Sequence, residues 1–359
     1  MIPALCATLL PLLVLPAPAF RTAQPGYVFQ FPRDHGAHPA FAMEWWYFTG
    51  HLWSADGARR YGYQLTFFRR ALGAAPRAPG AWNGSPGWRA DPIFLAHAAL
   101  TEVNGGRFRT ETRLNRAGLP AAASAAGLDL RNGGWTARMG ADGRIQLGFS
   151  VGAAALDLEL APATPPVVYG EDGVSRKGAD PAAASHYLCF PRLASTGSLV
   201  LPDRQESLHG LSWMDHEFSS SQLAPDQVGW DWAGIQLGDG RSLMVYRLRD
   251  AAGAQDPWST LTEVAGDGRI LRTTRAFRLT GGVWRGPSGA VYPLPLRLEA
   301  WGERWTLEPL VADQELRTRA GTPITYWEGA CRVRDGQGRP CGDAYVELTG
   351  YAHSMQGRF

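Results

Sequence analysis

The feature that most constrains the fold of this sequence is a hairpin pattern that occurs twice. One copy runs from Trp45 to Arg70 with Asp56-Gly57 in its turn, and the other runs from Trp230 to Arg249 with Asp239-Gly240 in its turn. In each copy tryptophans begin the outgoing strand, a leucine precedes the turn, and arginines end the return strand. Because one supersecondary unit recurs, the sequence predicts two similar β domains. A weaker third copy runs from Tyr326 to Tyr351.

Strand signals dominate the rest of the chain. Short aromatic or β-branched runs alternate with Gly-rich and Asp-rich turns every eight to twelve residues or so, which is typical of an all-β barrel or sandwich. Residues 121–128 are alanine-rich without an amphipathic stripe, so we expect a loop or one short turn there. Residues 162–184 are rich in Pro, Gly and Ala and predict a long loop. We expect an N-terminal domain over residues 20–200 and a C-terminal domain over residues 205–359, with few short helices.

Composition and motifs exclude several classes of function. The formal net charge is only +2, and Lys177 is the one lysine among 35 basic residues, for which coding bias is the simplest interpretation. The arginines are dispersed, so nucleic-acid binding is not expected. The sequence contains no P-loop, dinucleotide fingerprint or Gly-x-Ser-x-Gly elbow. No CxxC or Cys/His spacing suggests zinc, so we predict no metal and no cofactor.

The first 19 residues predict a signal peptide. Residues 9–15 are apolar and too short to span a bilayer, and Ala17-Pro18-Ala19 fits a small-x-small cleavage site. No basic residue precedes the apolar run, so an uncleaved membrane anchor is the alternative. Cleavage near Ala19 predicts a periplasmic or secreted protein without a transmembrane helix in the mature chain.

Cysteine pairing is left open by the sequence. Removal of Cys6 with the signal peptide leaves Cys189, Cys331 and Cys341, an odd number. Cys331 and Cys341 flank a predicted hairpin turn, where an oxidising compartment allows a cross-strand disulfide. Two unpaired thiols are the equal alternative.

Carboxylates lie among tryptophans in several strands. Alternation places Glu44 on the same strand face as Trp46, and a buried carboxylate must be paired or protonated. Desolvation raises a carboxyl pKa, which suits a general acid. The competing interpretation, which we favour for Glu44 alone, is a salt bridge to an arginine that closes a barrel end.

The segment from Trp213 to Phe218 is the most polar of these clusters. Asp215 and Glu217 share a strand face with Trp213, whereas His216 points the other way. An acid/base pair here is ordinary chemistry. A metal site formed by Asp215, His216 and Glu217 is disfavoured, because adjacent strand residues diverge.

Two further segments repeat the arrangement. Trp230 and Trp232 share one face and Asp231 takes the opposite face, either as a partner for a core indole or as an acid in an aromatic pocket. Tyr326 and Glu328 form another same-face pair, and Glu347 shares its face with Tyr351. The sequence alone does not place these residues in one cavity.

Together these motifs resemble the AttH/CrtC-like family, which includes secreted lipocalin-like proteins once labelled predicted hydrolases, as well as carotenoid 1,2-hydratases (hydroxyneurosporene synthases). The resemblance covers about residues 27–353 and is closer to the AttH-type secreted branch. It is carried by Phe31-Pro32-Arg33-Asp34-His35, Glu44-Trp45-Trp46-Tyr47-Phe48-Thr49-Gly50-His51-Leu52, Trp213-Met214-Asp215-His216-Glu217, Gly229-Trp230-Asp231-Trp232, Tyr326-Trp327-Glu328-Gly329 and Glu347-Leu348-Thr349-Gly350-Tyr351.

The resemblance implies two lipocalin-like antiparallel β-barrel domains and a hydrophobic small-molecule ligand. One hypothesis is a carrier for a lipid or isoprenoid, with an ABC transporter as partner. The other is a hydratase that adds water to an isolated C=C bond without a cofactor, through acid catalysis; a hydrolase is less favoured. For the hydratase we predict catalytic roles for Asp215, His216 and Asp231. The predicted ligand-binding residues are Glu44, Trp46, Trp213, Glu217, Trp230, Trp232, Tyr326, Glu328 and Tyr351.

Overall fold

The computed structural model describes residues 20–72, 92–221, 223–318 and 323–357. The predicted signal peptide and its cleavage site lie outside these residues. Within the described ranges the protein is all-β, and its one helical element is a short 3-10 turn, η1 (Arg33–His35). None of the described helical residues forms a span long and apolar enough to cross a membrane.

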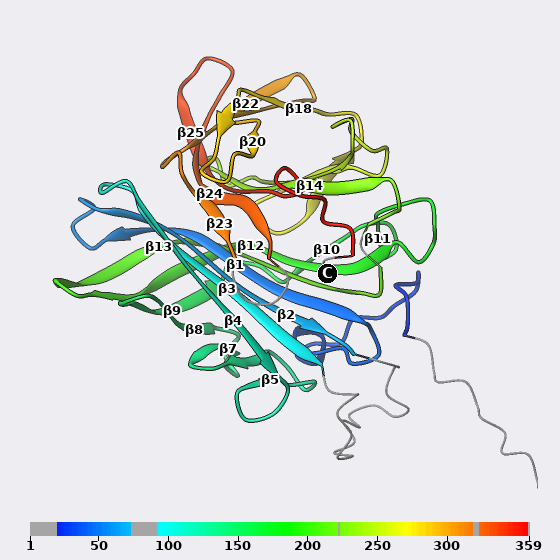
Figure 1. Cartoon of the computed structure of the whole chain (residues 1–359), viewed down its shortest axis with the longest axis horizontal. Coiled ribbons are helices and arrows are strands. Elements are labelled where there is room, and N and C mark those ends of the chain that lie inside the picture. Colours follow the sequence, from blue (N-terminus) through cyan, green and yellow to red (C-terminus); the bar gives the residue numbers. More distant parts are fainter. Residues whose placement is uncertain (1–19, 73–91, 222, 319–322, 358–359) are drawn as a thin grey trace, which may run out of the picture.

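The first sheet runs in the order β4-β3-β2-β1-β13-β12-β9-β8-β7-β6-β5, and β10 and β11 also pair with β12. It curls into a nearly closed barrel in which β3 and β4 approach β8 (Figure 1). Its strands are β1 (Met43–Ser54), β2 (Arg60–Arg70), β3 (Ile93–Glu102), β4 (Arg107–Arg116), β5 (Ala121–Ala123), β6 (Asp129–Asn132), β7 (Trp135–Met139), β8 (Ile145–Val151), β9 (Ala154–Pro162), β10 (Val167–Tyr169), β11 (Ser175–Arg176), β12 (Ala184–Leu201) and β13 (Arg204–Ser219).

The second sheet runs in the order β17-β16-β15-β14-β25-β24-β22-β21-β18, and β23 also pairs with β24. It lies above the first sheet in Figure 1. Its strands are β14 (Gln227–Leu237), β15 (Ser242–Asp250), β16 (Thr260–Val264), β17 (Ile270–Thr274), β18 (Arg278–Gly281), β21 (Leu296–Ala300), β22 (Glu303–Pro309), β23 (Glu315–Arg317), β24 (Thr325–Arg334) and β25 (Pro340–Leu348). A separate two-stranded ribbon joins β19 (Trp284–Arg285) to β20 (Val291–Tyr292).

The two sheets repeat one strand order. β1, β2, β3 and β4 correspond to β14, β15, β16 and β17, and the hairpin β12–β13 corresponds to β24–β25. The paired hairpins found in the sequence are therefore β1–β2 and β14–β15, and Gly57 and Gly240 take the positive φ values that their turns require. The weaker third hairpin is β24–β25, which corresponds to β12–β13 and not to β1–β2.

The chain crosses between the sheets after the predicted domain boundary. The boundary at residues 200–205 coincides with the turn between β12 and β13, and β13 still pairs with β1 in the first sheet. The second sheet begins at Gln227. The division into two independently folding domains stays a prediction.

Each barrel interior is filled by side chains. Trp46, Phe48 and Leu52 belong to the core of the first barrel, whereas Ile235 and Trp327 belong to the core of the second. A third apolar cluster lies between the sheets, formed by Tyr47, Tyr187, Trp213, Trp232, Tyr246 and neighbouring residues. Since successive side chains alternate between faces, each central strand contributes to a barrel core and to this shared layer.

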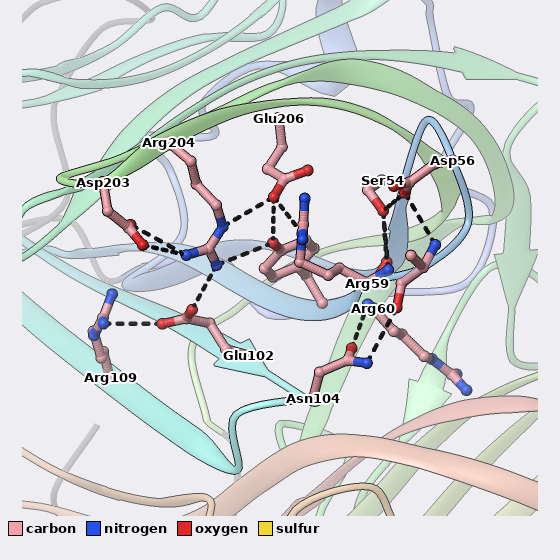
Figure 2. A network of polar contacts seen from close by, with 12 residues as sticks. Ser54, Asp56, Arg59, Arg60, Glu102, Asn104, Arg109, Asp203, Arg204 and Glu206 are labelled. Atoms are coloured by element: carbon pink, nitrogen blue, oxygen red, sulfur yellow. Dashed lines mark hydrogen bonds and ion pairs between the residues drawn. The ribbon is translucent and has the colours of Figure 1, made fainter.

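A polar network ties three turns together at one end of the first barrel (Figure 2). Glu206 accepts hydrogen bonds from Arg59 Nε at 2.5 Å and Arg204 Nε at 2.9 Å. Glu102 pairs with Arg109 and Arg204 at 2.9 and 3.2 Å. These residues come from or flank the turns β1–β2, β3–β4 and β12–β13. The network therefore holds these three turns together at one end of the first barrel.

Two local expectations need correction, and one open alternative is resolved. Residues 121–123 form strand β5 paired with β6, and the expected loop at 162–184 contains β10 and β11, because β12 extends far enough to pair with both. Of the two alternatives that the sequence left open for Cys331 and Cys341, the structure has the unpaired one, because both are free thiols. In the β24–β25 register Cys331 faces Ala344, three residues from Cys341, so the two Cα atoms are roughly 10 Å apart, too far for a disulfide.

Candidate functional site

A pocket opens between the two sheets rather than inside either barrel. The cavity has a volume of about 60 Å³. Both sheets supply its walls, and most of the lining side chains are aromatic. The lining residues are Trp45, Tyr47, Thr66, Phe68, Tyr187, Asp215, Glu217, Trp230, Trp232, Tyr246, Tyr326 and Glu347. Its aromatic lining with a few polar side chains is typical of a small-molecule site.

Asp215 is the buried carboxyl group that β13 presents to this pocket. Its Oδ2 accepts a hydrogen bond from the Tyr187 hydroxyl at 2.6 Å, and its Oδ1 accepts one from Trp213 Nε1 at 2.8 Å. Trp232 Nε1 donates to the same Tyr187 hydroxyl at 3.1 Å. Burial raises the pKa of Asp215 to about 7, although these hydrogen bonds oppose the rise. Asp215 is thus a fixed carboxyl group that exchanges a proton near neutral pH.

Glu347 presents a second carboxyl group from β25. Its Oε2 accepts a hydrogen bond from Trp230 Nε1 at 2.8 Å. Burial raises the pKa of Glu347; the Trp230 hydrogen bond opposes this, and the negative charges of Asp215 and Glu217 add to it. The carboxyl groups of the two sheets are therefore close enough to interact across the pocket.

Asp215 and Glu347 occupy corresponding positions of the repeat. Asp215 lies opposite Tyr47 in the β1–β13 pairing, and Glu347 lies opposite Trp232 in the β14–β25 pairing. Tyr47 and Trp232 are the third residues of the repeated hairpin strands, counted from Trp45 and Trp230. Packing the repeated faces against one another therefore brings both acids to one cavity.

Glu328 lies beside Glu347, in the first half of β24. The two glutamates are direct cross-strand partners, and Glu328 is fully buried. Burial and the Glu347 charge raise the pKa of Glu328 far above its ordinary value, while the Tyr47 and Tyr326 hydroxyls oppose that rise. Two adjacent buried carboxyl groups do not both ionise readily, so this pair retains a proton at neutral pH. Tyr326 also contacts His97 Nδ1 through its hydroxyl, at 2.8 Å.

Glu217 differs from the other pocket acids because it has a cationic partner. Lys177 Nζ lies 3.0 Å from Glu217 Oε2, and the Ser185 hydroxyl donates to the same oxygen. Lys177 is fully buried, with its Nζ 4.0 Å from the ring centre of Tyr246 and 5.2 Å from that of Tyr187. Glu217 lines the pocket, and Lys177 lies behind it.

Glu44, Trp46 and His216 lie on the opposite face of the first sheet. Glu44 accepts hydrogen bonds from Arg69 Nε at 2.9 Å and shares its Oε1 with His38 Nδ1 at 2.7 Å and His216 Nε2 at 2.9 Å. Burial acts to raise the pKa of Glu44, but His38 and Arg69 outweigh it and hold that pKa well below its usual range. Glu44 thus forms the arginine salt bridge favoured from the sequence.

The ligand atoms of His38, Glu44 and His216 lie within 4.8 Å of one another, a spacing that a metal ion could bridge. The residues fit such an ion poorly, because the Arg69 guanidinium already neutralises Glu44 and both imidazoles already contact its carboxylate. We read this cluster as a buried hydrogen-bond network at the end of the first barrel.

Asp231 also points away from the pocket. Its carboxylate pairs with Arg247 at 3.0 Å and Arg249 at 2.9 Å, and accepts a hydrogen bond from the Tyr351 hydroxyl at 2.9 Å. The structure therefore does not bring Asp215, His216 and Asp231 together. Alternation along β13 and β14 turns His216 and Asp231 toward the barrel interiors while their neighbours face the pocket.

Of the predicted ligand-binding residues, Glu217, Trp230, Trp232 and Tyr326 line the pocket. Trp213 and Glu328 lie just behind its wall, whereas Glu44, Trp46 and Tyr351 do not reach it. The catalytic and binding assignment missed Glu347, Tyr187, Tyr47, Tyr246 and Lys177. The sequence showed that Glu347 shares a strand face with Tyr351 and that Lys177 is the single lysine. Neither observation shows which face of a strand meets the other sheet.

The comparisons with known proteins agree with this architecture. The model of the AttH-like family matches residues 22–351. The chain belongs to the AttH-like family. A candidate AttH from Nitrosomonas europaea is 32% identical, with a TM-score of 0.82, over 92% of this chain and 100% of that chain. No curated protein matches the chain.

More distant structures share the AttH-like fold. Kievitone hydratase from Nectria haematococca is 14% identical, with a TM-score of 0.67, over 94% of this chain and 98% of that one. CghA is 13% identical, with a TM-score of 0.54, over 94% of this chain and 95% of that one. At these identities the similarity establishes the lipocalin-like fold alone.

Proposed function

We propose that this AttH-like protein binds an apolar, unsaturated small molecule between its two sheets and hydrates an isolated C=C bond by acid catalysis. The supporting observation is the placement of Asp215 and Glu347 on opposite walls of one aromatic pocket, both with raised pKa. A site that only carried an apolar molecule would gain nothing from buried acids, which cost free energy to bury.

The chemistry assigned to the pocket has two parts. A protonated carboxyl group, Glu347 or Asp215, gives its proton to one alkene carbon, which leaves a cation on the other carbon. Tyrosine and tryptophan faces stabilise that cation, and water then forms the C–O bond. Glu347 is the better donor because, among the described residues, the hydrogen bond that it accepts reaches Oε2 alone, whereas both oxygens of Asp215 accept hydrogen bonds.

The fold shared with kievitone hydratase supports a hydratase over other reactions of alkenes. The isoprenoid class of substrate follows from the family resemblance and from the aromatic walls of the pocket, which suit a neutral unsaturated chain.

The proposal is tested by incubating the purified protein with a panel of acyclic carotenoids and shorter isoprenoid alkenes, and then measuring products by mass spectrometry. We expect a mass gain of one water. Glu347→Gln and Asp215→Asn should each lower kcat about 10²-fold to 10⁴-fold while ligand binding changes by less than about threefold. Asp226→Asn, in an exposed turn, is the matched control.

Turnover unaffected by both acid variants refutes the assignment of the acids. A folded protein that binds the alkenes but hydrates none of them between about pH 5 and pH 9 is instead a carrier, the second function that the apolar walls support. If no apolar ligand binds in a broad lipid screen, both functions fail.

We further propose that the protein acts in the periplasm or outside the cell, after removal of the segment ending near Ala19, and works with an ABC export system. N-terminal sequencing of protein recovered from a periplasmic extract tests the first point. Affinity purification that recovers an exporter subunit tests the second.

A further inference from the structure

Lys177 is distinguished by its identity as much as by its position. It is the only lysine among 35 basic residues, so elsewhere the chain uses arginine. Its side chain is fully buried, and its backbone N–H donates to the Ala183 carbonyl at 2.7 Å while its carbonyl accepts from Gln227 Nε2 at 2.8 Å. Coding bias explains why lysine is rare in this chain, but it does not explain why the single lysine lies behind the pocket wall.

The site favours an ammonium over a guanidinium. Nζ lies 4.0 Å from the ring centre of Tyr246 and 3.0 Å from the Glu217 carboxylate, in a space with no exposure to solvent. An ammonium is a compact point charge, whereas a guanidinium needs a planar, wider site. A buried charge of this kind persists only with a counter-ion, so Lys177 and Glu217 stabilise each other as a charged pair.

Glu217 can act on the pocket because the contacts of this pair converge on one oxygen. Lys177 and Ser185 both reach Oε2, and Glu217 is itself a pocket-lining residue. The Glu217 carboxylate lines the pocket beside the carboxyl groups of Asp215 and Glu347, whose pKa values burial raises to about 7. The pocket thus contains donors and an acceptor.

We propose that Glu217 is the base that removes a proton from the attacking water, and that Lys177 is the positioning residue that keeps Glu217 charged and oriented. This inference rests on the proposed hydration. The alkene gains a C–H bond to the proton from Glu347, water forms the C–O bond, and the excess proton passes to Glu217. Return of that proton to Glu347 through pocket water restores the starting state, so alkene plus water gives alcohol.

Several titratable groups surround the Glu217 carboxylate and must be considered in any pH profile. They are Lys177 before β12, Tyr187 on β12, Asp215 on β13, Tyr246 on β15 and Glu347 on β25. The pKa of each tyrosine is raised far above its ordinary value by burial, so neither ionises in the working range. Asp215 and Glu347, whose pKa values are raised by burial, remain as the groups that shape the profile.

The experiment compares Glu217→Gln, Lys177→Met and the double variant with the wild-type protein. Glu217→Gln should lower kcat at least about 10²-fold and change ligand affinity by less than about threefold. Lys177→Met leaves the buried Glu217 carboxylate without its counter-ion, so this variant should add a loss of turnover on the acidic side of the pH profile. The double variant removes both charges and serves as the folding control.

A readout without substrate accompanies the kinetics. Infrared absorption of protonated carboxyl groups should show one more such group in Lys177→Met than in the wild type near neutral pH, and the double variant should lack it. The inference is overturned if turnover survives Glu217→Gln, or if Lys177→Met keeps both the wild-type pH profile and the wild-type infrared band. If the wild type hydrates no alkene, the proposed function fails and the base role fails with it, whatever the infrared result.

Discussion

The protonation of Asp215 makes a quantitative prediction about stability. Burial raises the pKa of Asp215 from 3.8 to about 7. Between these values the folded protein keeps the proton while the unfolded chain releases it, so stability is lost as pH rises through this window. A pKa difference of about 3 corresponds to roughly 4 kcal/mol, of which about 3 kcal/mol falls between pH 4.5 and pH 8.5.

Asp215→Asn removes this penalty because an amide does not ionise. The difference in free energy of unfolding between the variant and the wild type should therefore shift by about 3 kcal/mol in favour of the variant as pH rises from about 4.5 to about 8.5. Urea denaturation at each pH measures this difference. At acidic pH it should be slightly less stable, by about 1 kcal/mol, since the amide cannot reproduce both hydrogen bonds to Tyr187 and Trp213. Asp226→Asn, in an exposed turn, should show no such trend. A stability difference that does not vary with pH refutes the claim that Asp215 is buried and protonated.

Three further predictions concern other residues. Arg69→Met should lower the free energy of unfolding by about 3–5 kcal/mol, because it leaves the buried Glu44 carboxylate without its guanidinium partner. Arg69→Met combined with Glu44→Gln should recover part of that loss. Equal losses in the single and double variants contradict this prediction. Thiol titration of the unfolded mature chain without reductant should find three thiols, whereas a single thiol indicates a disulfide. Trp230→Phe removes the hydrogen bond that lowers the pKa of Glu347, so the alkaline fall of turnover should move to higher pH; an unshifted fall excludes Glu347 as the donor.

The sequence predicted the hairpins correctly because their pattern lies within one short segment. The tryptophan-rich hairpins formed as predicted, because alternation and an Asp-Gly turn determine a two-stranded unit without help from the rest of the chain. Alternation also placed Asp215 and Glu217 on one face, with His216 on the other.

The sequence did not predict the pocket between the sheets, because the pocket depends on strand pairings between segments that are distant in the chain. β1 pairs with β13 and β14 pairs with β25, and no short-range signal specifies either contact. Central strands such as β14 are buried almost throughout, so the sequence does not distinguish the face toward the barrel core from the face toward the other sheet. Alternation separated His216 and Asp231 from their neighbours on each strand, but it did not show which of the two faces meets the pocket.

The pocket lies between the sheets and not within a barrel. A crystal structure of the protein with a bound acyclic isoprenoid alkene would show whether the ligand occupies this pocket. We predict the ligand against Trp45 and Trp232, with its C=C bond in contact with the carboxyl groups of Glu347 and Asp215. A ligand inside either barrel, among the core residues around Trp46 or Trp327, would contradict the account.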